Sequence, residues 1–323
     1  MNKNTEKIRR LHQRGGLKSF KELGVLLALV ALCIVIGLIN PVFFSPNNLL
    51  NVLRQISMLG IVAVGGAMVI ITGGIDLSAG TMIALGGILC AWFVQLGLNA
   101  WLAMLASIAA CAILGTITSS LFIVKLRITP FIATLAMMDI SKGITFMITR
   151  GVPISFKTSL DFIGGTIGPI PVSVIIMFVV MIIGYIVLEK TEFGRKIYAL
   201  GGNERAAILS GVRVNRIKIS VYAIISGLCA LAGIIAAANV SSAVTSSGNG
   251  YELEVIAAVV IGGASLSGGR GSILGVLLGA CILGVIKNGF VLLMVPNYWQ
   301  YITTGVVIVI ACALDEFRRS RSN

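Results

Sequence analysis

Long runs of apolar residues, each about as long as a bilayer is thick, dominate this sequence. A helix needs about 20 mostly apolar residues to cross the hydrocarbon core of a membrane. The runs here are continuous and lack the alternation of apolar and polar residues that marks a membrane-spanning β-strand. Only 11% of the 323 residues are charged, against about 25% in soluble domains. The sequence therefore predicts an all-α integral membrane protein.

About ten segments qualify as transmembrane helices within a single domain, 23–316. Residues 1–22 are expected to form a basic cytoplasmic segment and 317–323 a short cytoplasmic tail. The first span is expected to be retained, because the polar stretch before it is too long for the basic region of a signal peptide. The predicted spans are 23–40, 56–72, 81–97, 100–124, 128–148, 170–189, 217–240, 252–267, 272–294 and 299–316. The span 252–267 is short and glycine-rich, and charge interrupts 128–148.

The basic residues assign the two sides of the membrane. With the N-terminus placed in the cytoplasm, twenty Lys and Arg residues fall inside and three outside, as the positive-inside rule requires. This bias favours an even number of spans and two cytoplasmic termini. The net charge of +13 does not indicate nucleic acid as a partner, because the basic residues form short clusters between spans.

Cysteine and histidine offer little chemistry. The only histidine is His12, in the basic N-terminal segment, which excludes histidine-based acid–base or metal chemistry in the spans. The six cysteines lie within or at the ends of apolar runs without metal-ligand spacing. They are expected to be small packing residues.

One segment between two predicted spans is strongly polar: residues 189–218, EKTEFGRKIYALGGNERAAILSGVRVNRIK. The pair Gly201–Gly202 is expected to end one helix, and Asn203 to cap the next. Glu204 then lies in the first turn, where its charge complements the helix dipole, and Gly211 stops the helix. The predicted helix has about two turns and is too short to be stable alone. It packs on the membrane domain or on a partner, unless the segment is an ordinary loop on the bilayer surface.

Several stretches resemble the permease subunits of bacterial sugar-import ABC transporters of the ribose/xylose/arabinose class. The most specific is ALGGNERAAILSGVRVNRIKISVYAIISGLCALAGII, Ala199–Ile235. The resemblance covers nearly the whole chain, through NPVFFSPNNLLNVLRQ (Asn40–Gln55), ITGGIDLSAG (Ile71–Gly80), ITPFIATLAMM (Ile128–Met138) and GYELEVIAAVVIGGASLSGGRGS (Gly250–Ser272).

The resemblance implies a fold similar to the ten-helix type II ABC importers, in which two permeases pack around one central pathway in the bacterial cytoplasmic membrane. It implies that the cytoplasmic loop 190–216 carries a coupling helix that docks on an ATPase subunit. It also implies that a periplasmic or extracellular sugar-binding protein supplies most of the selectivity. The expected coupling residues are Gly201, Gly202, Asn203, Glu204, Ala206, Ala207 and Gly211.

The chain lacks a phosphate-binding loop of the form GxxxxGK[ST], so we expect no ATPase activity and no bound cofactor or metal. Gly268–Ser272 superficially resembles such a loop, but the Lys-Ser/Thr pair is missing. Active transport would then require Mg-ATP on a partner ATPase.

Ionisable residues within predicted spans are informative because they are costly in lipid. Asp139 and Lys142 are three residues apart and are expected to form a structural ion pair, or alternatively to line the pathway. Asp76 either caps the following helix or closes the cytoplasmic end of the pathway. Lys287 is expected to snorkel towards the membrane surface. Candidate gate or pathway residues are Gly73, Gly74, Asp76, Ser78, Asp139, Lys142 and Asn288.

Two further carboxylates, Glu252 and Glu254, are expected at the external end of the span 252–267. They are either solvated loop charges or part of a docking surface for the binding protein. An internal echo is also present: Val69–Gly80 and Val259–Gly269 share the pattern GG-x-x-LS-x-G. Tight turns can converge on such residues, but broken helices in related hairpins are typical of transporters.

Three functional classes can be distinguished by the residues that each would need. An ATP-driven monosaccharide importer agrees best with the pattern, with ribose or a related sugar as cargo; an autoinducer-type sugar or a nucleoside is the alternative cargo. A stand-alone secondary transporter would need ion-coupling carboxylates at mid-membrane, and Asp139 is the only carboxylate there. An intramembrane enzyme would need a nucleophile–base pair or a metal set, and none is found. The sequence leaves open whether the second permease is an identical chain or a paralogue.

Overall fold

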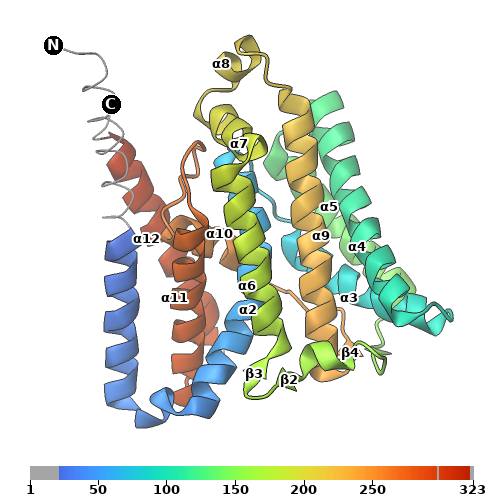
Figure 1. The fold of residues 1–323 in the computed structure, drawn as a ribbon, viewed down its shortest axis with the longest axis vertical. Coiled ribbons are helices and arrows are strands. Elements are labelled where there is room, and N and C mark those ends of the chain that lie inside the picture. The colour runs from blue at the N-terminus through green and yellow to red at the C-terminus, as the bar shows by residue number, and fades with distance from the viewer. Residues whose placement is uncertain (1–21, 297, 321–323) are drawn as a thin grey trace.

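Residues 22–296 and 298–320 are described by a computed structural model, and they form a multi-pass helical bundle (Figure 1). Seven of the described helices are long and apolar enough to cross a membrane. They are Glu22–Ile39, α2 (Pro46–Ile71), α4 (Ala100–Ile117) with its π-helical continuation η2 (Thr118–Lys125), α5 (Pro130–Thr149), α6 (Val172–Tyr185) with its π-helical continuation η4 (Ile186–Lys190), α9 (Val214–Val240) and α11 (Ile273–Leu292).

Three other helices coincide with predicted spans but have shorter apolar parts: α3 (Ala79–Gln95), α10 (Tyr251–Ile261) and α12 (Tyr298–Ser320). The prediction for 252–267 is wrong in its extent, because α10 ends at Ile261 and a glycine turn comes next. Eleven residues make a helix of about 16 Å, roughly half the thickness of the hydrocarbon core. By contrast, α5 is continuous, so the charges in 128–148 do not interrupt it. That all ten segments cross the membrane stays a prediction.

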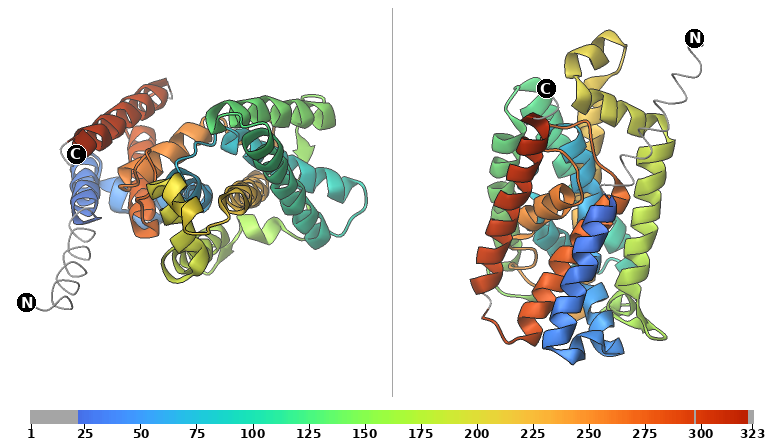
Figure 2. Two further views of the ribbon diagram at one scale, coloured as in Figure 1. Left: turned by 90° about the horizontal axis from the view of Figure 1, so that it is seen from above. Right: turned by 90° about the vertical axis from the view of Figure 1, so that its left-hand side faces the viewer.

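Helix α9 lies in the middle of the bundle, packed against α2, α3 and α4 (Figure 2). Small residues allow these contacts to be close. A Cβ atom at Gly65 of α2 would lie 2.7 Å from the Cα of Ile225, and Gly87 of α3 faces the main chain of Gly233. On the other side, α11 packs against α2 and α10. Glycine residues therefore allow close approach of these helices, within a core that also buries large side chains such as Met82, Leu85 and Ile88.

The two ends of the bundle differ. At one end, two short two-stranded sheets cover the helices: β1 (Ile154–Ser155) pairs antiparallel with β4 (Ser242–Ala243), and β2 (Thr166–Ile167) with β3 (Ile170–Pro171). The 3-10 helices η1 (Pro41–Phe44) and η3 (Asp161–Gly164) complete this end. At the opposite end, α7 (Glu192–Gly202) and α8 (Glu204–Leu209) project above the bundle (Figure 1).

Parts of the predicted terminal segments lie outside the described residues. These parts are 1–21, which include His12, and 321–323. The predicted tail 317–323 begins inside a helix, because α12 continues to Ser320.

Candidate functional site

The projecting segment is two helices separated by one extended residue. Asn203 has φ −163° and ψ 104°, and its side-chain oxygen accepts a hydrogen bond from the Ala206 N–H at 2.9 Å. The predicted cap at Asn203 is therefore confirmed, as is the stop at Gly211, whose φ is +79°. The prediction that Gly201–Gly202 ends the preceding helix is also confirmed, because Gly202 is the last residue of α7. The helix that comes after Asn203 has six residues, fewer than predicted.

Helix α8 turns one small residue inward and its apolar ones outward. Ala207 is buried, whereas Ile208 is 55% and Leu209 89% exposed. An ion pair between Lys218 Nζ and Glu204 Oε1, 2.8 Å long, ties α8 to α9. Ile208 and Leu209 are absent from the predicted coupling residues. Both residues could have been predicted from the sequence, because apolar side chains exposed on a short helix among charged residues indicate an interaction surface.

Helix α7 is anchored to the interior by Tyr198. Its hydroxyl donates to the Gly271 carbonyl oxygen at 2.9 Å and lies 3.3 Å from Glu189 Oε1. Burial, together with the neighbouring Glu189 carboxylate, raises the pKa of this hydroxyl. The hydroxyl therefore stays protonated and remains a hydrogen-bond donor.

The turn from Gly73 to Ser78 begins at the exposed Gly73 and then enters the bundle, where Asp76 and Ser78 are buried. Asp76 is only 6% exposed. Its Oδ1 atom accepts hydrogen bonds from the Ser78 N–H at 2.8 Å and from the Ser78 hydroxyl at 2.6 Å. Ser78 immediately precedes α3, but in the described part of the chain no side chain makes a capping hydrogen bond at the start of that helix. Asp76 therefore stabilises the turn before α3, and the capping alternative is not confirmed. Gly73 supplies the turn with a φ of +82°, and Gly74 packs beside the buried Tyr222 hydroxyl.

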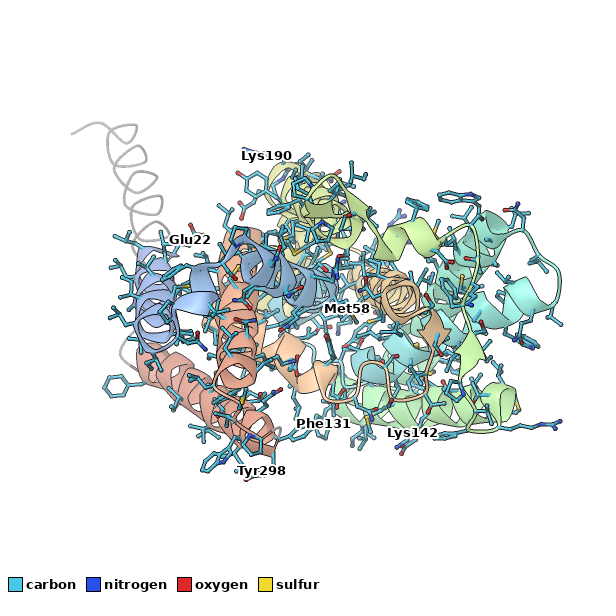
Figure 3. The ribbon with its side chains drawn as sticks, turned by 90° about the horizontal axis from the view of Figure 1, so that it is seen from below. Glu22, Met58, Phe131, Lys142, Lys190 and Tyr298 are labelled. Carbon is cyan, nitrogen blue, oxygen red and sulfur yellow. The ribbon has the colours of Figure 1, made fainter. Side chains whose placement is uncertain are left out.

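Asp139 and Lys142 do not form the expected ion pair. Both side chains are exposed on the outer side of α5, and the ion pairs of the described residues include none between them. Lys142 lies at the edge of the molecule in Figure 3. The face of α5 turned towards the bundle instead carries hydroxyl groups, from Thr134, Ser141 and Thr145 among others.

Asn288 is far from that face. It is 2% exposed and exchanges two hydrogen bonds with Asn48 of α2, at 2.8 and 3.0 Å. The predicted gate residues are therefore not brought together: the Gly73–Ser78 turn enters the bundle, Asp139 and Lys142 lie on the surface of α5, and Asn288 joins α11 to α2.

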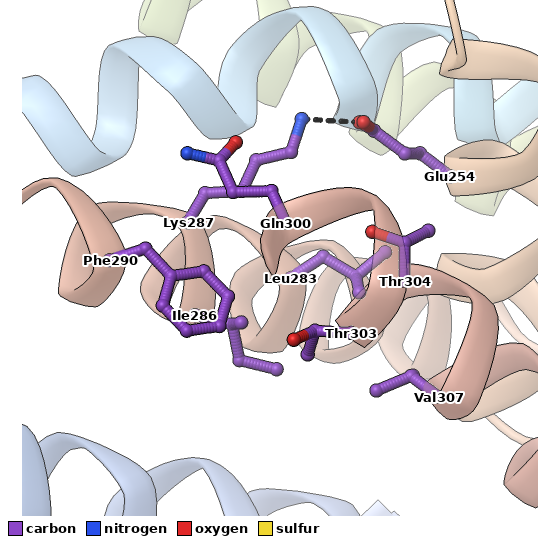
Figure 4. Close-up of a pocket in the computed structure, with 9 residues that line it drawn as sticks. All are labelled: Glu254, Leu283, Ile286, Lys287, Phe290, Gln300, Thr303, Thr304 and Val307. Atoms are coloured by element: carbon purple, nitrogen blue, oxygen red, sulfur yellow. Dashed lines mark hydrogen bonds and ion pairs between the residues drawn. The ribbon is translucent and has the colours of Figure 1, made fainter. Parts of the chain in front are cut away.

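Lys287 does not snorkel. Its Nζ atom lies 2.6 Å from Glu254 Oε2 and 5.2 Å from the centre of the Tyr251 ring. The pair borders a small pocket between α10, α11 and α12 that Phe290 and Thr304 also line (Figure 4). Glu254 is thus buried, not a solvated loop charge, and Glu252 beside it is half-buried. The prediction missed this pair because its members are 33 residues apart.

The described residues contain no group of three or more His, Cys, Asp or Glu side chains that could hold a metal ion. The fold and these sites define a class: a multi-pass membrane protein with a short helix, exposed and partly apolar, projecting from one end. A family model described as "branched-chain amino acid transport system / permease component" matches residues 48–312. No solved structure matches.

Comparison with curated proteins identifies the type of permease more closely. The ribose import permease protein of Escherichia coli (strain K12) is 46% identical over 297 residues, which cover 90% of this chain and 92% of that protein. The ribose import permease protein of Bacillus subtilis (strain 168) is 43% identical over 312 residues, 95% of each chain. The galactose/methyl galactoside import permease protein of E. coli (strain K12) is 36% identical over 332 residues, 96% of this chain and 98% of that protein. The chain therefore belongs to this permease family, as a ribose-type sugar ABC permease.

Proposed function

We propose that this chain is one of two permease subunits of an ATP-driven importer for ribose or a closely related sugar, in the cytoplasmic membrane of a bacterium. Mg-ATP is bound and hydrolysed by a separate ATPase, and an external binding protein delivers the sugar. Both chain termini face the cytoplasm. Alternating access results when closure of the ATPase subunits moves the projecting helices.

The observation that carries the proposal is the exposed apolar tip of α8. Leu209 is 89% exposed on a helix of six residues, and a helix this short needs tertiary contacts to persist. Apolar anchors of this kind dominate the energy of protein interfaces when a partner covers them. A groove on a cytoplasmic ATPase is the partner that the projecting position supports.

The outer face of α5 supports the second permease. Asp139 and Lys142 are exposed there beside apolar residues such as Phe146 and Met147. Charged side chains facing lipid are costly, and within membranes they usually face protein or a water-filled path. A second permease packed on α5 would enclose both charges along the translocation pathway.

The test of the ATPase contact is co-purification from native membranes in mild detergent. We expect an ATPase subunit at near-stoichiometric recovery with the wild-type chain, and recovery at least about tenfold lower for Leu209→Asp. Val152→Asp is the matched control, because Val152 is also strongly exposed but lies after α5, near the opposite end. Full recovery with Leu209→Asp would remove α8 from the interface. A wild-type chain that purifies alone and moves ribose without ATP would establish a stand-alone transporter.

The second permease is tested by cross-linking in a variant whose six cysteines are replaced. Asp139→Cys is expected to yield a permease–permease cross-link with a short bifunctional reagent. Leu102→Cys, which is also exposed but lies on α4, is expected to give none. Identical yields from both positions would contradict a pathway along α5. Mass spectrometry of the cross-linked product then distinguishes a second copy from a paralogue.

The cargo is tested by uptake competition in cells. We expect unlabelled ribose to suppress uptake of labelled ribose more strongly than galactose, arabinose or a nucleoside does. Stronger suppression by one of the other compounds would reassign the cargo while leaving the permease class intact.

A further inference from the structure

Three main-chain segments meet beneath the projecting helices with no side chain between them. They are the C-terminal end of α2 with its turn (Ile71–Gly73), the end of α7 (Gly201–Gly202) and the turn Gly268–Gly269; we call their meeting point the glycine junction. The Ile71 carbonyl oxygen accepts a hydrogen bond from the Gly269 N–H at 2.8 Å. A Cβ atom at Gly268 would lie 2.9 Å from the Gly201 carbonyl oxygen and 3.0 Å from the Gly73 nitrogen.

Gly201 is the centre of this junction. A Cβ atom there would overlap the Ile71 carbonyl oxygen and lie 2.5 Å from the Gly269 nitrogen. Its neighbour Gly202 is also helical, yet a Cβ atom at Gly202 would meet nothing within 4 Å. Of these two glycines of α7, only Gly201 is therefore required for steric reasons.

Hydrogen bonds fasten α7 to the same turn. Besides the Tyr198 contact with Gly271, the Ser272 hydroxyl caps α11 by accepting from the Gly275 N–H at 3.0 Å and donates to Glu22 Oε1 at 2.7 Å. A displacement of α7 would therefore also displace the start of α11 and, through Ser272, the helix Glu22–Ile39.

A second set of contacts links the junction to α5. After Gly73 the chain continues to Leu77, whose N–H donates to the Thr134 hydroxyl oxygen at 3.1 Å. That hydroxyl is fully buried and lies 3.2 Å from the Ile75 carbonyl oxygen, to which it can donate. Thr134 sits in the second turn of α5, the helix whose outer face carries Asp139 and Lys142.

We infer that Gly201 and Thr134 are positioning residues that pass movement of α8 through the glycine junction to α5. The inference rests on the proposed function, since it explains how an ATPase-driven movement would reach the pathway. Main-chain atoms in direct contact have no rotamers to absorb a displacement, and protein interiors are packed too densely to deform locally. The route from α8 runs through α7, the Ile71–Gly73 segment and Leu77.

The experiment compares Gly201→Ala with Gly305→Ala, each introduced into the chromosomal copy; Gly305 is a helical glycine of α12, where an added Cβ would meet nothing within 4 Å. Both changes replace a helical glycine by alanine, so their effect on helix propensity is matched. Two quantities are measured: uptake of labelled ribose by cells, and ATP hydrolysis by the purified complex of this chain with its co-purifying ATPase. We expect Gly201→Ala to assemble and to hydrolyse ATP, but to take up about tenfold less ribose per ATP. Gly305→Ala is expected to match the wild type in both.

A second pair keeps the inference falsifiable if Gly201→Ala fails to assemble. Thr134→Val preserves the shape of the side chain but removes the hydroxyl that holds Leu77, whereas Thr134→Ser retains it. We expect reduced ribose uptake per ATP for Thr134→Val and recovery for Thr134→Ser. A purely structural role would lower the amount of complex without changing this ratio.

The outcomes separate the two claims. If the wild-type chain recovers no ATPase, the proposed function fails before the variants are made. If the wild type takes up ribose with ATP hydrolysis and both Gly201→Ala and Thr134→Val keep its ratio of ribose to ATP, the inference is overturned and the proposed function stands.

Discussion

Two turns of this molecule share the pattern GG-x-x-LS-x-G, but only one of them leads directly into a helix. The turn Gly73–Gly80 passes straight into α3, which begins at Ala79. The turn Gly262–Gly269 is succeeded by further non-helical residues until α11 begins at Ile273. The order of the helices is also reversed, because the first turn joins the longer α2 to the shorter α3, and the second joins the short α10 to the longer α11.

The difference arises from the positions that the pattern leaves free. In the first turn, Asp76 accepts both hydrogen bonds from Ser78 and stabilises the turn before α3. The second turn has Ser265 at the position of Asp76, and it ends with Gly268 and Gly269, which have φ of +85° and +72°. An α-helix excludes positive φ. One carboxylate that stabilises the turn and one extra glycine thus distinguish the turn that leads into a helix from the turn that does not.

The largest loss of stability is expected for Gly268→Ala. In the second turn, Gly268 combines a positive φ with close packing against α7. Alanine disfavours the positive φ, and its Cβ would press on the Gly201 carbonyl oxygen at 2.9 Å. The two effects together are expected to lower the free energy of unfolding by about 2 to 5 kcal/mol. Thermal unfolding of the purified chain in detergent measures the loss, and an unchanged midpoint would contradict the packing described.

A smaller effect is expected for Gly73→Ala in the first turn. Its φ of +82° is nearly the same, but the nearest atom to an added Cβ is 3.9 Å away. Only the conformational penalty remains, about 1 to 2 kcal/mol, by the same unfolding measurement. Equal losses for Gly73→Ala and Gly268→Ala would show that close packing does not distinguish the two turns.

The smallest effect is expected for Asp76→Ala, which removes the acceptor of the hydrogen bonds from Ser78 in the first turn. Loss of such an acceptor costs about 1 kcal/mol. Asp76→Asn is the control, because its amide oxygen can still accept from the Ser78 N–H. We expect Asn to recover most of the unfolding free energy that Ala loses. If the Asp76→Asn and Asp76→Ala variants lose the same free energy of unfolding, hydrogen bonding to Ser78 does not explain the stabilising effect of the carboxylate.

The local features of this molecule were predictable, because they depend on neighbours in sequence. Apolar runs locate the helices, Asn203 caps the helix directly after it, and Gly211 ends it with a positive φ. The extent of α10 was less predictable, since apolar residues continue past Ile261 and only the paired glycines mark its end.

The long-range features could not be predicted from one sequence. The partner of Lys287 is Glu254, and that of Asn288 is Asn48, 240 residues away. The role of Gly201 was predicted only in part for the same reason. The sequence correctly indicates that a helix ends at Gly201–Gly202, but the steric need for glycine at Gly201 comes from the main chain of Ile71 and Gly269.

The amide pair between Asn48 and Asn288 has a consequence for how this protein is made. Asn48 is synthesised 240 residues before its partner, which corresponds to about 12 to 48 s of translation. During that time the second helix holds a polar amide in or near lipid, with only the Phe43 carbonyl oxygen as a local acceptor. The contacts of α2 are therefore completed only when α11 has been synthesised, so a late stage of membrane insertion completes the packing of an early helix.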